Sequence, residues 1–444
     1  MLDLPLLRHF DLDSVFAYGG SAPVTVRQFL HDALRIAEQL PDKAHVLNVC
    51  RDRYRFCVGF AAALLRKQVT LMPPNQTADM LQRLQAAYGE IYRLADASEP
   101  GCALPTVPFP QLGACPGGPF EVPMIAGTQP AALMFTSGST GEPLPYRKSW
   151  AALVASGASE AARLGLTGSG TAMLGTVPPQ HMYGLESTVM MSFQAGLPLH
   201  GARPFYPADI CDALAVLPRP RALVTTPVHL RTLVSEMSSV PPLDLIVCAT
   251  APLAVELAVE CEGRFKAPLY EIYGCTEAGQ IATRRTVETS EWQALPGIRL
   301  RQDEEGSWVS GGHVQEEVLL NDLIELRGAD RFLLHGRNAD LVNIAGKRTS
   351  LAHLNHQLNS IAGVRDGVFI VPGEDSSSLQ RLMAFVVAPG LTREAVLDAL
   401  RCRIDPAFMP RPLSLVTALP RNATGKLPQS ALLALVAETD ARED

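Results

Sequence analysis

The sequence predicts an α/β fold with a large N-terminal body of layered sheets and helices and a small, mobile α+β C-terminal domain. Short apolar segments alternate with helical segments along most of the chain, which is typical of a parallel sheet covered on both faces. Near residue 338 the chain becomes polar, and the remaining stretch of about 100 residues has strand and helix patterns of its own. We therefore expect two domains, at residues 1–338 and 339–444.

The first helix shows the expected pattern clearly. Residues 25–40 place apolar side chains on one face, Thr25 and Gln28 have the spacing of a capping box, and Pro41 ends the segment. Residues 100–130 are crowded with proline and glycine and predict a connection without long regular structure. The other expected elements are strands at 45–50, 68–72, 131–135, 171–177, 222–226, 245–249, 269–273, 368–371 and 382–387 and helices at 54–67, 149–164 and 392–402.

The composition excludes several classes of protein. Hydrophobic residues make up 47% of the chain and charged residues 19%, which fits a folded globular protein. The net charge of −7 and the lack of a dense Lys/Arg block argue against a nucleic-acid partner. The N-terminus lacks the pattern of a signal peptide, and no apolar run approaches the roughly 20 residues that span a bilayer, so we expect no membrane association.

The number and spacing of the cysteines indicate a reducing compartment. The nine cysteines are scattered and include no CxxC pair, which argues against a disulfide framework or a structural zinc site. We therefore expect a cytoplasmic protein.

A glycine-rich loop follows the apolar run at 131–135. Its residues are Thr136, Ser137, Gly138, Ser139, Thr140 and Gly141. Glycines let a backbone approach a phosphate closely, and hydroxyls add neutral donors, so the loop can hold phosphate oxygens. A surface turn has the same composition, and this stretch alone does not distinguish the two. The loop does not end in GKS or GKT, which disfavours an ordinary P-loop NTPase.

Other stretches carry polar residues at the ends of expected strands. Glu277 follows a strand and a glycine, where a single carboxylate can help to hold Mg²⁺. Asp322 lies 15 residues before Arg337, and such a pair can bind a ribose, although two surface charges have the same spacing. Lys426 lies in a Gly-Lys turn near the C-terminus, where an ammonium group can stabilise a developing negative charge or simply face solvent.

In chain order these motifs resemble the adenylate-forming superfamily of acyl-CoA synthetases, adenylation domains and luciferases. The motifs are TSGSTGEP, PPQHMYG, CATAPL, YGCTE, the Asp322–Arg337 pair, GRNAD and NATGK. The resemblance covers nearly the whole chain and implies the fold of that superfamily. It also implies an AMP-forming acid–thiol ligase. Such an enzyme uses ATP and Mg²⁺ to convert a carboxylic acid into an acyl-AMP, releasing pyrophosphate, and then transfers the acyl group to a thiol.

The resemblance assigns roles to individual residues. Thr276 would contact the α-phosphate or the substrate carboxylate, Glu277 would hold Mg²⁺, and Lys426 would bridge the attacking carboxylate and the α-phosphate. Asp340 would be a hinge about which the C-terminal domain rotates, removing Lys426 and bringing in the loop at Gly346. The implied nucleotide-binding residues are Thr136 to Gly141 for the β- and γ-phosphates, Thr250, Ala251, Pro252, Tyr273 and Gly274 for the adenine, and Asp322 and Arg337 for the ribose.

Three departures from the family pattern concern charge. Leu144 stands where the glycine loop usually continues with a lysine, and Arg147 or Lys148 would have to compensate. Asn343 and Asn355 replace an expected lysine and glutamate after the hinge, and Gln429 replaces an arginine near Lys426. These losses remove charge from the C-terminal half of the site but spare Lys426, Glu277 and Asp322.

The acid and the thiol are suggested by a finer resemblance. The length and the TSGSTGEP…KSW form resemble the stand-alone ligases of aryl polyene and xanthomonadin-type pigment pathways, which load a hydroxybenzoate onto an acyl carrier protein. The resemblance implies 3- or 4-hydroxybenzoate as the acid, bound near His181, Tyr183, Gly184 and Cys275. Free CoA is the alternative acceptor. Two other functions stay open, a family member that binds nucleotide without catalysis and a P-loop-type ATPase or kinase that would release orthophosphate.

Overall fold

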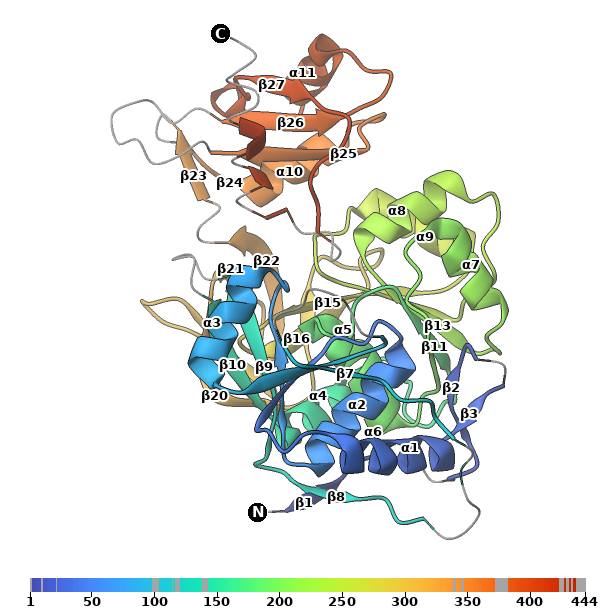
Figure 1. Ribbon diagram of the computed structural model, residues 1–444. Helices are drawn as coiled ribbons and strands as arrows, with labels where there is room; N and C mark the ends of the chain where they lie inside the picture. Colours follow the sequence, from blue (N-terminus) through green and yellow to red (C-terminus); the bar gives the residue numbers. More distant parts are fainter. Residues whose placement is uncertain are drawn as a thin grey trace.

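The protein is described here from a computed structural model, in which a smaller C-terminal domain lies beside a large N-terminal body (Figure 1). The structure describes the whole chain except residues 1, 9–10, 21, 98–103, 114, 116–119, 138–142, 338–340, 345–346, 372–381, 423–426, 429–430, 433 and 437–444.

The first sheet of the body has the strand order β10-β9-β5-β4-β6-β7. Its neighbours are parallel except for the antiparallel hairpin of β9 and β10. The strands are β4 (His45–Asn48), β5 (Val69–Met72), β6 (Ile91–Ala95), β7 (Thr106–Pro108), β9 (Pro130–Ser137) and β10 (Pro143–Ser149).

The second sheet has the order β21-β22-β17-β16-β15-β14-β13-β11-β12-β2-β3. Its middle, from β2 to β15, is parallel, whereas both ends are antiparallel. The strands are β2 (Val15–Tyr18), β3 (Val24–Thr25), β11 (Ala172–Gly175), β12 (Leu199–His200), β13 (Arg221–Thr225), β14 (Leu245–Cys248), β15 (Leu269–Cys275), β16 (Gly279–Arg284), β17 (Trp292–Ala294), β21 (Asp322–Leu326) and β22 (Arg331–Arg337).

Smaller sheets complete the body. The pair β1 (Asp3–Pro5) and β8 (Met124–Ala126) lies near the N-terminus. A separate antiparallel sheet contains β18 (Ile298–Gln302), β19 (Ser307–Gly311) and β20 (Val314–Leu320).

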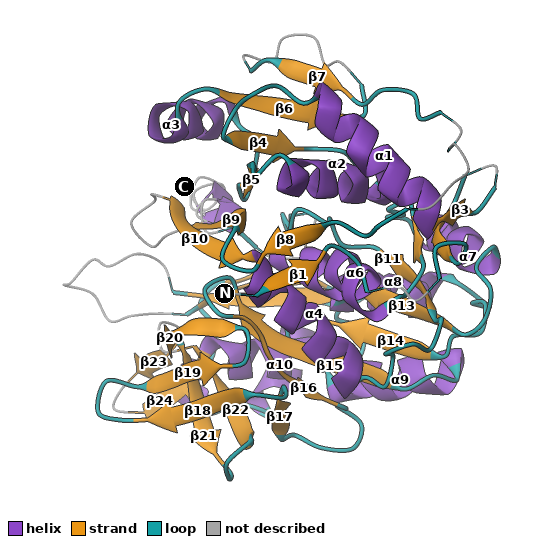
Figure 2. Cartoon of the chain, turned by 90° about the horizontal axis from the view of Figure 1, so that it is seen from below, coloured by secondary structure: helices purple, strands orange, loops and turns teal. Residues whose placement is uncertain are grey.

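Helices pack between and around the two large sheets (Figure 2). Helix α2 is mostly apolar and buried on nearly every side, and it shares one core with α1, η1 and α6. The Thr25 hydroxyl caps α1 by accepting a hydrogen bond from the backbone N–H of Gln28 at 3.2 Å, as the capping pattern predicts. The helices are α1 (Val26–Gln39), α2 (Arg53–Leu65), α3 (Ala78–Tyr88), α4 (Trp150–Arg163), α5 (Met182–Gly184), the π-helix η1 (Leu185–Met190), α6 (Met191–Ala195), α7 (Pro207–Ala215), α8 (Pro227–Glu236) and α9 (Val255–Phe265).

The C-terminal domain has a hydrophobic core of its own, running from Val342 to Leu413. Arg231 on α8 of the body donates a hydrogen bond to the backbone carbonyl of Arg365 at 2.5 Å. The domain limit at residue 338 and the hinge at Asp340 stay predictions, and Asp340 lies outside the described residues. The elements are β23 (Leu341–Ile344), β24 (Lys347–Ser350), α10 (Leu351–Asn359), β25 (Asp366–Ile370), β26 (Met383–Val387), α11 (Arg393–Arg401), the 3₁₀ helix η3 (Pro406–Phe408) and β27 (Leu413–Leu415).

The expected α/β fold, with a large body and a small C-terminal domain, is confirmed. Each strand and helix expected from the sequence occurs within a few residues of its predicted place. The expectation of a parallel sheet holds for the middle of each large sheet, but the sequence did not predict the antiparallel strands from β16 to β22. Within the described residues no helix is long and apolar enough to cross a membrane, and the described cysteines carry free thiols.

Two buried carboxyl groups join α4 to its neighbours β16 and η1. Glu160 on α4 accepts a hydrogen bond from the side-chain amide of Gln280 at 2.7 Å, and Glu186 on η1 accepts one from the Ser156 hydroxyl at 2.6 Å. Burial raises the pKa of Glu160 to about 8 and that of Glu186 to about 7. Glu160 is therefore largely protonated at neutral pH.

Glu160 should make the stability of the protein depend on pH. Its pKa is raised from 4.5 to about 8, so the folded protein keeps a proton that the unfolded chain loses in this range. The free energy of unfolding should therefore fall as the pH rises from 4.5 towards 8. In Glu160→Gln this fall should shrink by on the order of a few kcal/mol, because one pKa unit corresponds to about 1.4 kcal/mol. Urea unfolding across this pH range measures it. Exposed Glu304→Gln serves as the control, and an unchanged pH dependence in Glu160→Gln would contradict the assignment.

Candidate active site

The glycine loop joins the two strands of the β9–β10 hairpin. In this hairpin Thr136 lies opposite Leu144 and Ser137 lies opposite Pro143. The sequence predicted the loop but not the returning strand β10. Gly138, Ser139, Thr140 and Gly141 lie outside the described residues, as do the side chains of Thr136 and Ser137, so their phosphate contacts stay a prediction.

The residues expected to bind the nucleoside come together at the end of the second sheet. The Tyr273 hydroxyl donates a hydrogen bond to Asp322 Oδ2 at 2.9 Å. The Tyr273 ring packs against Trp292 and Phe332, with ring centroids 5.7 and 5.6 Å away. Asp322 lies directly opposite Arg337 in the antiparallel pair of β21 and β22. The 15-residue spacing therefore reflects a hairpin that brings both backbones to one place.

The expected adenine loop follows β14. Thr250 has a φ of +85°, which places its backbone in the left-handed region at the sharp turn that leaves the strand. Directly after Ala251–Pro252, the backbone N–H of Leu253 donates to Glu271 Oε1 at 3.3 Å. Glu271 is buried and also accepts from Arg284 Nε at 2.7 Å. Glu271 therefore anchors this loop to β15, a role that the sequence reasoning missed.

The turn between β15 and β16 carries Thr276 and Glu277. A side chain on Gly274 would place its Cβ 2.3 Å from the carbonyl oxygen of Gly279, so only glycine fits this close approach of the two strands. Cys275 Sγ accepts a hydrogen bond from the backbone N–H of Ala278 at 3.5 Å. Burial, and secondarily the charge of Glu277, raise the pKa of Cys275 to about 12. The thiol therefore stays protonated and is not a nucleophile at neutral pH.

Lys148, on β10, reaches this turn. Its ammonium group is almost fully buried and donates a hydrogen bond to the backbone carbonyl of Glu277 at 2.6 Å. Arg147 is exposed, and Leu144, at the place of the expected loop lysine, is also exposed. Of the two cations proposed to compensate for that lysine, Lys148 is the one in contact with the Glu277 turn.

The residues expected to surround the acid lie around α5. The His181 imidazole caps this short helix, with its Nδ1 accepting from the backbone N–H of Tyr183 at 3.3 Å. The buried Tyr183 hydroxyl faces the carbonyls of Thr225 and Val247 at 3.1 and 2.9 Å. Tyr183 thus ties α5 to two parallel strands through its hydroxyl, and a contact between its ring and the acid stays a prediction.

Gly184 is fixed by packing. A Cβ on this residue would lie 2.0 Å from the carbonyl oxygen of Pro178, so a side chain would push α5 away from the end of β11. Its proximity to the acid stays a prediction, as it does for Cys275.

Several predicted C-terminal residues cannot be placed. Lys426, Gly346 and Gln429 lie outside the described residues, and so do the side chains of Arg337 and Asn343. Asn355 is described, and its Oδ1 accepts from the backbone N–H of Phe369 at 2.6 Å. This asparagine therefore joins α10 to β25 instead of supplying a charge.

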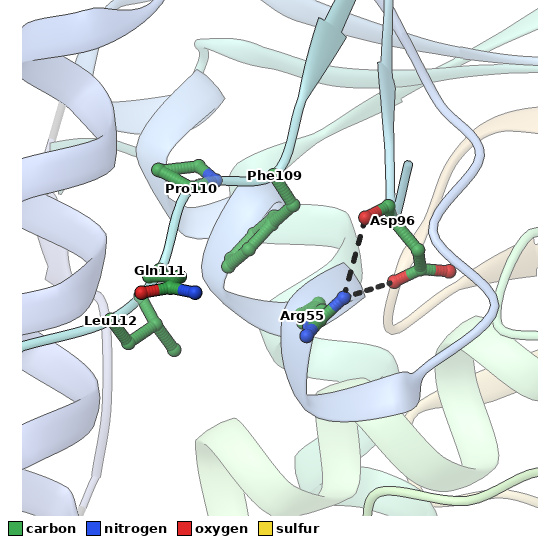
Figure 3. A pocket seen from close by; sticks show the side chains of 6 residues that line it. All are labelled: Arg55, Asp96, Phe109, Pro110, Gln111 and Leu112. Atoms are coloured by element: carbon green, nitrogen blue, oxygen red, sulfur yellow. Dashed lines mark hydrogen bonds and ion pairs between the residues drawn. The ribbon is translucent and has the colours of Figure 1, made fainter. Parts of the chain in front are cut away.

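A pocket of about 430 Å³ lies away from these residues (Figure 3). Its Arg55 forms an ion pair with Asp96 at 3.4 Å and lies over the Phe109 ring, 5.6 Å from the centroid. None of the predicted site residues lines this pocket, and the arginine already has an acidic partner. We assign it no role in the chemistry.

The Glu277 turn fits a magnesium ion that also binds phosphate oxygens. Mg²⁺ commonly takes one or two carboxylates together with substrate phosphates and waters. The described residues contain no cluster of three or more His, Cys, Asp or Glu side chains that could hold a metal by itself. The half-buried Glu277 therefore fits a metal shared with ATP better than a dedicated protein cage.

Comparisons with known proteins identify the family. The family model described as AMP-binding enzyme matches residues 38–300, which is more than half of the 444 residues. The chain belongs to the AMP-binding enzyme family. It is 30% identical over 310 residues to the 4-coumarate–CoA ligase of Rhodobacter capsulatus, covering 68% of this chain and 76% of that protein. It is 26% identical over 359 residues to the 2-succinylbenzoate–CoA ligase of Listeria monocytogenes, covering 70% and 72%.

Solved structures show the same fold. ATP-bound MatB from Rhodopseudomonas palustris has a TM-score of 0.81 at 19% identity, covering 96% of this chain and 97% of that chain. The O-succinylbenzoate coenzyme A synthetase MenE from Bacillus subtilis, in complex with AMP, has a TM-score of 0.79 at 20% identity, covering 93% and 94%. These likenesses confirm the adenylate-forming fold. Membership of the family confirms the expectation of an AMP-forming acid–thiol ligase that activates a carboxylic acid with ATP.

Tyr273→Phe should weaken ATP binding without unfolding the protein. The substitution keeps the ring packed on Trp292 and Phe332 but removes the hydroxyl that holds Asp322. One such hydrogen bond contributes about 1–1.5 kcal/mol, so the KM for ATP should rise about five- to tenfold. Initial rates of pyrophosphate release at varied ATP concentration measure this. Tyr270→Phe, on the same strand, is the control, and an unchanged KM in Tyr273→Phe would contradict the role of this bond.

Proposed function

We propose that the protein activates an aromatic carboxylic acid, with 3- or 4-hydroxybenzoate as the expected substrate, and transfers it to the phosphopantetheine thiol of an acyl carrier protein. The observation that carries the activation step is the Tyr273–Asp322 contact beside the turn of Thr276 and Glu277. The names of two relatives support an aromatic acid, because 4-coumarate and 2-succinylbenzoate both contain a benzene ring. The TSGSTGEP…KSW form supports the carrier protein and a place in aryl polyene-type pigment synthesis.

In the first half-reaction a carboxylate oxygen attacks the α-phosphorus of ATP. The new P–O bond forms as the bond to the β-phosphate breaks, and pyrophosphate leaves. In this proposal Asp322 and Tyr273 orient the ribose, and Thr276 donates to the α-phosphate or the carboxylate. Lys426 places a positive charge between the two reacting groups. A bound Mg²⁺ would neutralise charge on the phosphates.

In the second half-reaction a thiol attacks the acyl carbonyl of the adenylate and AMP leaves. The thiol proton passes to solvent. The attack requires Lys426 to leave the site, which the proposed rotation of the C-terminal domain about Asp340 would achieve. The protein's own Cys275 does not compete as nucleophile, because burial keeps its thiol protonated. In this proposal the acceptor thiol belongs to another molecule.

Free CoA is the second candidate acceptor. It is favoured by the relatives, since both the 4-coumarate and the 2-succinylbenzoate enzymes carry CoA ligase in their names. A phosphopantetheine arm presents the same thiol in either case, so the chemistry inside the site would not differ.

A panel of acids tests the substrate and the acceptor together. We expect pyrophosphate release with a hydroxybenzoate to exceed release with unsubstituted benzoate and with fatty acids, because the polar group expected in the acid pocket would favour a hydroxylated ring. The same assay, run with holo-carrier protein and separately with CoA, should show faster AMP release with the carrier. Faster AMP release with CoA would identify CoA, and not the carrier protein, as the acceptor. Orthophosphate in place of pyrophosphate, or no release with any acid, would refute the proposal.

Lys426→Ala should separate the half-reactions. Loss of the ammonium group should strongly slow acyl-AMP formation, because this group stabilises charge between carboxylate and α-phosphate. Thioester formation from a synthetic acyl-AMP should stay close to that of the unmodified protein, since Lys426 is expected to be absent from that step. Lys266→Ala, at an exposed helix end, is the matched control. Equal loss in both half-reactions would contradict this role of Lys426.

A further inference from the structure

Lys148 is a buried lysine in a strand whose neighbouring cation is exposed. Side chains alternate along a strand, so Arg147 and Lys148 face opposite sides of β10. Arg147 faces solvent, whereas only 7% of Lys148 is exposed. A buried ammonium group is unfavourable unless it is hydrogen-bonded and balanced by nearby negative charge. The burial of Lys148 therefore calls for a specific partner.

The partner is the turn that carries Thr276 and Glu277. Lys148 Nζ lies 2.6 Å from the carbonyl oxygen of Glu277, a distance typical of a charge-assisted hydrogen bond. Burial lowers the pKa of Lys148, while the nearby charge of Glu186 and then that of Glu277 act to raise it. The ammonium group thus lies close to the carboxyl groups of Glu186 and Glu277.

Glu186 lies against the other end of the same turn. A Cβ on Gly279 would lie 2.6 Å from Glu186 Oε1, so this carboxyl group packs directly against the backbone where the turn enters β16. Glu186 is itself fixed by the Ser156 hydroxyl. Contacts from β10 and from η1 therefore hold the two ends of the segment from Glu277 to Gly279.

We propose that Lys148 is a positioning residue for the adenylation step. By binding the backbone carbonyl of Glu277, it sets the orientation of Thr276 and Glu277. This inference rests on the proposed function of that turn. Lys148 also lies on the strand that follows the glycine loop, so its bond links the loop's hairpin to the residue expected to hold Mg²⁺.

In this inference Lys148 holds a turn of the protein and does not replace the missing phosphate-binding lysine. Leu144 lies beside the loop, and Lys148 follows it by four residues, which is about 13 Å along a strand. The ammonium group at Lys148 already donates to a protein carbonyl and is buried. A residue that orients a metal ligand typically changes metal affinity or activity about 10- to 100-fold when it is lost.

Lys148→Met tests the inference through the magnesium dependence of the reaction. The variant keeps the apolar stem but loses the hydrogen bond, so the carbonyl of Glu277 is left without this donor. We expect the rate of pyrophosphate release to fall about 10- to 100-fold and the Mg²⁺ concentration for half-maximal rate to rise. Thioester formation from a synthetic acyl-AMP should not change, because that step needs neither pyrophosphate release nor its metal. Lys43→Met, which removes a surface ion pair with Glu90, is the control.

The outcomes separate the inference from the proposed function. If the unmodified protein releases no pyrophosphate with any acid, the proposed function fails. If it is active and Lys148→Met keeps its Mg²⁺ dependence, the inference alone fails. A raised KM for ATP with unchanged Mg²⁺ dependence would instead make Lys148 a phosphate ligand and overturn the inference. If Lys148→Met does not fold, Lys148→Gln, whose side chain is shorter and uncharged, should show the same shift in Mg²⁺ dependence. An unchanged Mg²⁺ dependence in this variant would contradict the inference.

Discussion

The change from parallel to antiparallel pairing at β15 is the constraint on which the candidate site depends. On one side β15 pairs with β14 in parallel, and on the other it turns back into β16. The turn therefore lies at the carboxyl end of a parallel strand, next to the chain that leaves β14, where α/β sheets commonly bind ligands. Gly274 permits the tight approach of the two strands, and Tyr273, one residue earlier, reaches Asp322 on β21. One local reversal thus brings together the residues that are expected to bind adenine, ribose and a metal ion.

Without the usual loop lysine, the positive charge that binds phosphate has to come from other groups. With Leu144 exposed at that position, the described part of the β9–β10 hairpin places no cation where the family pattern has one. Neutral backbone N–H groups and hydroxyls can hold phosphate oxygens, but they do not neutralise charge. The magnesium ion expected at Glu277 and the lysine expected from the C-terminal domain would then supply most of the positive charge. Accurate placement of Glu277 matters more in such a site, which is consistent with a lysine that holds its backbone.

The sequence predicted those features whose signal is local. The short apolar strands have a recognisable local pattern, and the glycine loop and the YGCTE turn gain their meaning from occurring in order with the other motifs. It could not predict the antiparallel strands such as β20, whose residues are mostly exposed and whose pattern is that of a polar surface. It also could not separate Lys148 from Arg147, because two adjacent cations look alike until a partner more than a hundred residues away is placed. Tyr183 beside His181 suggested a pocket wall, but two strand carbonyls hold its hydroxyl.

The buried ionisable groups Glu160, Glu186 and Lys148 limit the net charge in the core near the turn. Glu160 is kept protonated by burial, so it serves as a neutral partner for the amide of Gln280 on β16. Burial raises the pKa of Glu186 to about 7, and the hydrogen bond from Ser156 and then the charge of Lys148 oppose part of that rise. An ionised Glu160 would repel the neighbouring Glu186, whose charge acts to raise the pKa of Glu160. Keeping Glu160 neutral avoids this repulsion, so Lys148 and Glu186 can hold the turn without a further unpaired charge in the core.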